Sequence, residues 1–271
     1  MASIDSAAIL DALNPASASR LSRLDVFPEI ESTNAYLMGE PAPNECEHRV
    51  AIAGHQTAGK GRGENRWLSA PGSSLCLSIA HTFRGRPGNL SALTLAVGVA
   101  AIRALQDLDA DDVKLKWPND IVALDGKLGG MLAESHHASA SSASVVVGIG
   151  INLELPPAIL GNLDSGWAHA PVDRKSLLGR VVPLESLAAA MIDRIADALL
   201  TFEEHGLQAF TKSWSECDWL RGRDITVQQP GGTVAGTASG IDNDGARLVR
   251  AADTTTRIIS GSILVDRVGS P

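Results

Sequence analysis

Two different spacings of apolar residues run along this chain, and each predicts a different kind of element. Between residues 184 and 205, large apolar side chains recur every three or four positions, which predicts a helix with one apolar face. They are Leu187, Met191, Ile195, Leu199 and Phe202. Between residues 75 and 81, Leu75, Leu77 and Ile79 alternate with small or polar residues, which predicts a half-buried strand.

Shorter patterns around that strand predict a mixed α/β domain. Helices are expected at residues 4–13, 35–38 and 90–108, and strands at 24–27, 50–55, 113–117 and 145–153. Asn14-Pro15 is expected to end the first helix. Asp125-Gly126 predicts a tight turn, so residues 127–134 are expected to return as the second arm of a hairpin. The polar run 136–144 predicts a loop.

The pattern changes after Trp219 to short β-rich runs separated by turn residues. These runs are 224–228, 234–241, 246–250 and 255–259, and they predict a small β-barrel. We therefore divide the chain into an N-terminal extension with a short helix (1–23), a mixed α/β domain (24–219) and a C-terminal domain (220–271).

Composition excludes several classes of protein. The chain of 271 residues is 44% hydrophobic and 20% charged, with a formal net charge of −8, which argues against disorder and against a basic surface for DNA or anionic lipid. Three widely spaced cysteines form neither a disulfide framework nor a metal knuckle. The N-terminus does not resemble a secretory signal, and the apolar stretches are too short to span a bilayer. We expect a cytoplasmic protein that binds neither DNA nor membrane.

The glycine-rich run from Gly54 to Gly63 is the first candidate for chemistry. It matches G-x-x-x-x-G-K, but Gly61 replaces the Mg²⁺-binding hydroxyl of a P-loop, and the following residues do not open a helix. The P-loop interpretation therefore fails. Glycines interleaved with Lys60 and Arg62 still favour a mobile cationic loop around an anion over an ordinary surface loop.

Three further segments are weak individually. Lys116-Trp117-Pro118-Asn119-Asp120 fits either a site at a strand end or a turn with a packed Trp. Gly129 and Gly130 after Lys127 indicate close approach of backbone or ligand. The run from Gly148 to Asn152 has G-x-G but not the third glycine of a dinucleotide fingerprint.

In this order, the segments resemble the motifs of the biotin–protein ligases. The chain has Ser32-Thr33-Asn34, then Gln56 followed by Gly59-Lys60-Gly61-Arg62, Lys116 to Asp120, Lys127 to Leu132, and Gly148 to Asn152. The resemblance implies an α+β fold: a mixed central sheet flanked by helices, as in class II synthetases, followed in the chain by a small C-terminal SH3-like barrel. It also implies a ligase that activates biotin with ATP and Mg²⁺ as biotinyl-5′-AMP. The acyl group would then pass to a lysine of the biotin carboxyl carrier protein of acetyl-CoA carboxylase.

The resemblance also assigns site residues. Biotin would be bound by Ser32, Thr33, Asn34, Gln56, Lys60, Gly61, Arg62, Lys127 and Gly130. ATP would be bound by Lys116, Asn119, Asn152 and Trp167, with Trp167 stacking on adenine. The catalytic residues would be Arg62, Lys127, Lys116 and Asp120.

Some features depart from the family pattern. Lys60 stands where bacterial members more often have Arg, and Gly63 and Glu64 alter the loop, so retention of the adenylate is expected to differ. Only 31 residues precede Ser32, so we expect a monofunctional form without the helix-turn-helix domain of bifunctional members. Family members can form homodimers, and a homodimer is possible here.

Alternative functions are a lipoate or octanoyl ligase of related fold, a biotin-sensing repressor, and an inactive adenylate-binding relative. The motifs around Lys60 and Lys116 favour biotin, and the missing N-terminal domain disfavours the repressor. Intact Arg62, Lys127 and Asp120 disfavour the inactive relative. We expect no protein-bound structural metal, because His136-His137 lacks further ligands and 242–245 is a turn.

Overall fold

The computed structural model describes residues 4–63, 65–85, 87–138, 142–160 and 171–265. Within them, the larger of two sheets contains seven strands in the order β1-β2-β3-β7-β6-β5-β4. Their bounds are β1 Leu21–Phe27, β2 His48–Ala53, β3 Ser74–Phe83, β4 Val113–Lys116, β5 Asp120–Ala123, β6 Gly126–Ala138 and β7 Ala143–Asn152. Strands β1 and β2 are parallel and the other neighbours are antiparallel, so the sheet is mixed.

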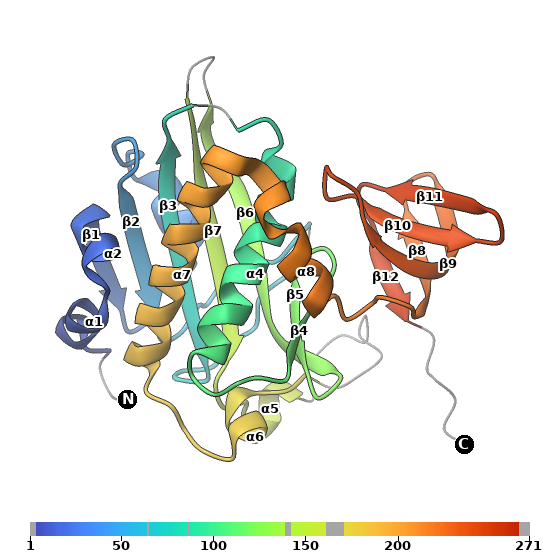
Figure 1. The fold of residues 1–271 in the computed structure, drawn as a ribbon. Helices are drawn as coiled ribbons and strands as arrows, with labels where there is room; N and C mark the ends of the chain where they lie inside the picture. The colour runs from blue at the N-terminus through green and yellow to red at the C-terminus, as the bar shows by residue number, and fades with distance from the viewer. Residues whose placement is uncertain (1–3, 64, 86, 139–141, 161–170, 266–271) are drawn as a thin grey trace.

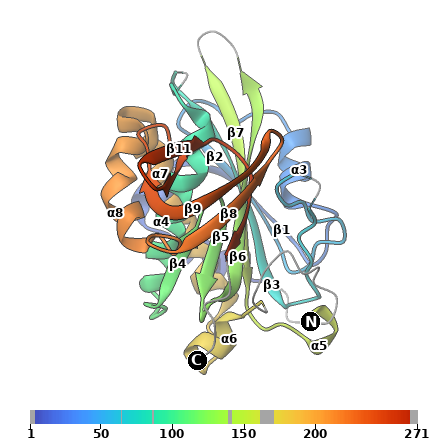
Figure 2. The same ribbon diagram turned by 90° about the vertical axis from the view of Figure 1, so that its right-hand side faces the viewer.

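Helices cover both faces of this sheet (Figures 1 and 2). On one face lie α4 (Leu93–Gln106), α7 (Leu184–His205) and α8 (Thr211–Cys217), together with the 3₁₀ turns Leu90–Ala92 and Gly206–Phe210. The short α1 (Ser6–Ala12) and α2 (Pro15–Arg20) pack against α7 near β1. The opposite face carries α3 (Thr33–Gly39). The short α5 (Pro157–Leu160) and α6 (Arg174–Leu178) lie at one end of the sheet.

The alternation predicted for residues 75–81 separates the core from the opposite face of the sheet. Leu75, Leu77 and Ile79 are fully buried among the helices α4 and α7. The intervening positions face α3, where Ala80 belongs to a second, smaller apolar cluster with Leu37. Because strand side chains alternate between faces, the small and polar residues of β3 are collected on the α3 side. That face holds the candidate site.

The C-terminal sheet is antiparallel throughout and has the order β11-β10-β9-β8-β12. Its strands are β8 Asp224–Gln229, β9 Gly232–Ile241, β10 Arg247–Ala251, β11 Thr254–Ile258 and β12 Ser262–Val265. Among the described residues, no strand pairing joins the two edges β11 and β12, so the small barrel expected from the sequence is seen as an open sheet. It lies beside α8 and the β4–β5 side of the larger sheet (Figure 1).

The structure confirms one predicted boundary, corrects another and adds two elements. Helix α1 ends at Ala12, just before Asn14-Pro15 as predicted, and a second helix that was not predicted, α2, follows with Asn14 as its cap and Pro15 in its first turn. Residues 136–138 continue β6, and β7 begins at Ala143, so the polar run 136–144 is not wholly a loop. Strand β12 was not predicted. None of the helices that the structure describes is long and apolar enough to cross a membrane.

Candidate active site

Three of the predicted motifs meet in one row across four strands of the larger sheet. Lys116 is paired in register with Asp120, Asp120 with Gly130, and Gly130 with Gly150, on four successive strands. Directly paired residues on neighbouring strands point to the same side of a sheet. Residues that are far apart in the sequence therefore share one surface, the face that carries α3.

Three cationic side chains surround the carboxylate of Asp120. Lys127 Nζ lies 2.6 Å from Asp120 Oδ1. Lys116 is buried, and that burial lowers its pKa to about 8, with the charge of Lys127 acting in the same direction and that of Asp120 opposing it. Burial also lowers the pKa of Arg62, again against the charge of Asp120. One carboxylate among three cations leaves a positive site suited to an anion.

A neutral polar cluster lies at the N-terminus of α3. Ser32 caps this helix by accepting the Ala35 N–H at 3.3 Å. The Thr33 N–H donates to Gln56 Oε1 at 2.7 Å, so the loop after β2 is bonded to the helix. Asn34 Nδ2 donates to Glu134 Oε2 at 2.8 Å. Hydroxyl and amide groups of this kind recognise a polar, uncharged ligand.

The glycine-rich loop folds back on itself beside this cluster. Gly61 N–H donates to the Asn65 carbonyl at 2.8 Å, and Trp67 N–H donates to the Gly59 carbonyl at 3.0 Å. Lys60 Nζ lies 3.9 Å from Glu134 Oε1. Arg62 donates through Nη1 to the carbonyl of Gly261 in the C-terminal domain, at 3.2 Å. The loop therefore contacts both domains.

Two glycines of the Gly148-Ile149-Gly150 run are required by close packing. A Cβ atom on Gly148 would lie 2.1 Å from Asn34 Oδ1. A Cβ atom on Gly150 would lie 2.4 Å from the ring of Trp67. Neither position has room for a side chain. The motif thus lets α3 and the glycine-rich loop approach the sheet.

Other predicted residues face backbone groups. Asn119 Nδ2 donates to the Met131 carbonyl at 2.9 Å, and Asn152 Nδ2 donates to the carbonyls of Lys127 and Val172 at 3.2 and 2.9 Å. Trp117 is buried and its Nε1–H donates to the Gly245 carbonyl at 2.9 Å. The tryptophan between Lys116 and Asn119 therefore connects this strand end to the C-terminal domain.

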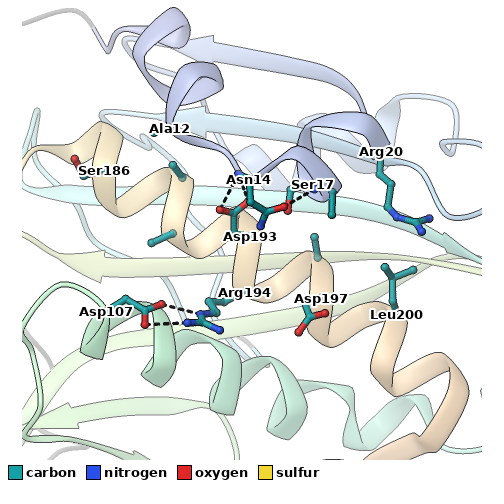
Figure 3. Close-up of a pocket in the computed structure, with 14 residues that line it drawn as sticks. Ala12, Asn14, Ser17, Arg20, Asp107, Ser186, Asp193, Arg194, Asp197 and Leu200 are labelled. Atoms are coloured by element: carbon teal, nitrogen blue, oxygen red, sulfur yellow. Dashed lines mark hydrogen bonds and ion pairs between the residues drawn. The ribbon is translucent and has the colours of Figure 1, made fainter.

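Two residues singled out in the sequence, Trp167 and Glu64, lie outside the described residues. Among those described, no group of three or more His, Cys, Asp or Glu side chains forms a metal site. A cavity of about 490 Å³ lies away from these residues, between α1, α2, α4 and α7 (Figure 3). Its lining includes the Arg194–Asp107 ion pair and Asp193, which accepts the Asn14 N–H.

Two polar residues of the site were missed in the sequence. Ser78 is fully buried on β3, where its Oγ lies 2.7 Å from Thr33 Oγ1 and donates to Asn34 Oδ1 at 2.6 Å. Glu134 on β6 contacts Asn34 and Lys60. The alternation of β3 placed Ser78 opposite the core, but no local signal tied either residue to α3.

A mixed sheet with a neutral cluster and a cationic cluster on one face, followed by an antiparallel C-terminal sheet, defines the class of biotin and lipoate ligases. Residues 26–152 match the Biotin/lipoate A/B protein ligase family, and residues 221–265 match the Biotin protein ligase C terminal domain. The chain belongs to the biotin protein ligase family.

Individual relatives support this assignment. The chain is 32% identical over 254 residues to a "Biotin--[acetyl-CoA-carboxylase] ligase" of Mycobacterium tuberculosis, covering 89% of this chain and 88% of the relative. It is 32% identical to the "Bifunctional ligase/repressor BirA" of Escherichia coli, covering 83% of this chain and 68% of the relative. The fold is similar to that of the Aquifex aeolicus biotin protein ligase in complex with biotin and ATP, with a TM-score of 0.74, 23% identity, and coverage of 91% of this chain and 99% of that one.

Proposed function

We propose that this protein is an ATP-dependent ligase that joins biotin to a lysine of a biotin carboxyl carrier protein. The observation that carries this proposal is the arrangement of Lys116, Lys127 and Arg62 around Asp120, beside the neutral cluster of α3. A cationic site next to a neutral one suits a ligand with an uncharged head and a carboxylate that must meet a triphosphate.

In the first half-reaction, a carboxylate oxygen of biotin would attack the α-phosphorus of ATP. The bond to the β-phosphate breaks and pyrophosphate leaves with the electron pair. Negative charge that develops between the two anions would be stabilised by Lys127 and Lys116, which the sheet register fixes beside Asp120. Arg62, on the adjacent loop, would hold the resulting adenylate.

In the second half-reaction, the lysine amine of the carrier would attack the acyl carbon of the adenylate. The C–O bond to phosphate breaks, AMP leaves, and the amine loses a proton to give the amide. This mixed anhydride is sensitive to water, so a loop that folds over it would favour transfer over hydrolysis. Lys60 and Gly61 would supply that cover.

Biotin would lie against Ser32, Thr33, Asn34, Gln56 and Gly130, and ATP against Lys116, Asn119, Asn152 and Trp167. Mg²⁺ would accompany the nucleotide, because this ion commonly uses one or two carboxylates together with substrate phosphates, and Asp120 supplies one carboxylate there. Bound there, it would neutralise phosphate charge. The carrier would be that of acetyl-CoA carboxylase, which the names of the relatives support, and the reaction would take place in the cytoplasm.

A transfer assay tests the proposal. Purified protein, ATP, Mg²⁺, biotin and a carrier domain should give a biotinylated carrier on a streptavidin blot. Labelling with lipoate but not with biotin would overturn the assignment. Lys127→Met should reduce biotin-dependent ATP–pyrophosphate exchange by about 100-fold. The matched control is Lys175→Met, since Lys175 is also paired with an acid, Glu154, and its side chain is 48% exposed.

A further inference from the structure

A continuous chain of side-chain contacts crosses the sheet beneath the N-terminus of α3. Gln56 Oε1 lies 3.1 Å from Thr33 Oγ1, which lies 2.7 Å from Ser78 Oγ. Ser78 Oγ lies 2.6 Å from Asn34 Oδ1, and Asn34 Nδ2 lies 2.8 Å from Glu134 Oε2. This chain joins α3 to the loop after β2 and to the strands β3 and β6, and it ends on the carboxylate of Glu134.

The carboxylate fixes the direction in which hydrogens are donated along this chain. An ionised carboxylate only accepts, so Asn34 must turn Nδ2 toward Glu134 and Oδ1 toward Ser78. The single hydroxyl hydrogen of Ser78 is then used on Asn34 Oδ1. The 2.7 Å contact between the two hydroxyls consequently requires Thr33 to be the donor.

This order leaves Thr33 Oγ1 with lone pairs and no hydrogen to offer a ligand. Gln56 Oε1 already accepts a hydrogen bond from the Thr33 backbone N–H at 2.7 Å. It is therefore satisfied without the longer contact, 3.1 Å, to the Thr33 hydroxyl. The site thus presents an acceptor at Thr33. The ureido group of biotin carries two N–H donors, which an acceptor at this position can receive.

We propose that Glu134 and Ser78 are positioning residues that set the hydrogen-bond polarity of the biotin site through Asn34 and Thr33. This inference rests on the proposed function, because it takes biotin as the ligand. Without the carboxylate, the Asn34 amide can rotate and the hydroxyls can reverse. Ser78 would then donate to Thr33 Oγ1, whose own hydrogen would point to Gln56 Oε1 or to the ligand, so Thr33 would have one lone pair fewer for a ureido N–H and recognition of the ureido head would weaken.

Glu134 has a second neighbour, Lys60, and the effect of this ion pair must be separated from that of the hydrogen-bond chain. Lys60 Nζ is 3.9 Å from Glu134 Oε1, and the two side chains are 51% and 27% exposed. Ion pairs as exposed as this one contribute little. If Glu134 acts through Asn34, loss of Ser78 and loss of Glu134 disrupt the same chain of hydrogen bonds, and their effects do not add. If it acts through Lys60, the two losses are independent and their effects add.

The experiment measures biotin-dependent ATP–pyrophosphate exchange by the full chain and by Ser78→Ala, Glu134→Gln and the double variant. Matched controls are Ser144→Ala, another buried serine of the same sheet, and Glu40→Gln, another partly exposed carboxylate near cations. Values of KM for biotin, KM for ATP and kcat are compared, and thermal melts report folding. Because Glu134 is partly exposed, its variant keeps the test informative even if Ser78→Ala unfolds.

The expected result is a rise of about tenfold in the KM for biotin in each single variant and no further rise in the double variant. The kcat and the KM for ATP should stay near those of the unmodified protein, and both controls should match it. Unchanged KM for biotin in folded variants, or additive effects in the double variant, would overturn the positioning role alone. No biotin-dependent exchange by the unmodified protein would overturn the proposed function, and this inference with it.

Discussion

Arg247 and Asp218 form a fully buried ion pair that fixes the C-terminal sheet to the rest of the molecule. Arg247 Nη1 lies 2.7 Å from Asp218 Oδ2, and both side chains are 0% exposed. Asp218 follows α8 and Arg247 begins β10, so the pair connects the two parts of the chain. Burial raises the pKa of Asp218 and lowers that of Arg247, while their mutual attraction opposes both shifts.

Breaking this pair should be costly, because the remaining partner is left as an uncompensated buried charge. We predict that Asp218→Asn lowers the free energy of unfolding by about 3 kcal/mol. Urea unfolding followed by circular dichroism measures it. Arg257→Gln removes an ion pair with Asp242 whose arginine is 44% exposed, and should cost less than about 1 kcal/mol. Equal stability of Asp218→Asn and the unmodified protein would contradict the prediction.

A second buried pair makes stability depend on pH. His48 and His81 stack with ring centroids 4.9 Å apart, and three of their four ring nitrogens have no hydrogen-bond partner among the described residues. The fourth, His81 Nδ1, lies 3.3 Å from the Glu47 carbonyl. Burial lowers the pKa of His48 to about 4 and that of His81 to about 3, and the charge of Arg20 acts in the same direction.

Stability should therefore fall as the solution becomes acidic. The unfolded chain binds protons on both rings below pH 6.5, whereas the folded protein does so only near pH 4 and pH 3. The two neutral rings contribute fully to the free energy of unfolding above pH 6.5. This contribution is lost on acidification, by about 2 kcal/mol for each ring between pH 7 and pH 5. The double variant His48→Leu and His81→Leu should show a flatter dependence in urea unfolding. His205→Gln, at an exposed position, should not change the slope of stability against pH. If the double variant had the same slope as the unmodified protein, the assignment of the pH dependence to His48 and His81 would be wrong.

The sequence predicts elements well where one period continues over many residues. The helix expected at 184–205 is α7 (Leu184–His205), and the turn at Asp125-Gly126 joins β5 to β6. The extension of β6 through residue 138 could not be read locally, because pairing of His137 with Ser144 on β7 stabilises a run whose composition is that of a loop. Tertiary pairing overrides local propensity there.

The site was predictable only as far as its residues belonged to recognised motifs. Lys127 and Asp120 were both expected among the catalytic residues, and Lys127 Nζ lies 2.6 Å from Asp120 Oδ1. Ser78 and Glu134 were missed because their partner Asn34 is 44 and 100 residues away in the chain. The sequence left open whether the segment around Trp117 forms a site or a turn with a packed Trp, and the packed Trp proves to donate its N–H to Gly245, 128 residues further on. Such contacts depend on strand order, which a single sequence does not specify.

Lys116 should give the first half-reaction an upper pH limit. Burial lowers its pKa to about 8, so its positive charge is lost as the pH rises above that value. Because the proposed role needs the charged form, ATP–pyrophosphate exchange should decline above about pH 8, approaching tenfold per pH unit. Lys116→Arg keeps a charge that does not titrate in this range and should remove the decline, even at a lower overall rate.

The profile is measured from pH 6.5 to 9.5 with saturating ATP and biotin. Lys114→Arg, two positions earlier on β4 and bonded to the Glu216 carbonyl, is the matched control and should keep the decline. If the decline in activity persists unchanged in Lys116→Arg, a group other than Lys116 causes it.

Gly148 should be as sensitive to substitution as the polar residues it faces. A Cβ atom there would lie 2.1 Å from Asn34 Oδ1 and 2.9 Å from Asn34 Cγ, closer than real Cβ contacts allow. Gly148→Ala must therefore displace Asn34, and with it the bonds to Ser78 and Glu134. Since small displacements of binding groups cost 10- to 100-fold, we predict a rise of about that size in the KM for biotin. Gly39→Ala, at the end of α3 where nothing lies within 4 Å, should leave KM unchanged. A normal KM in a folded Gly148→Ala protein would show that Asn34 has room to move without loss of binding.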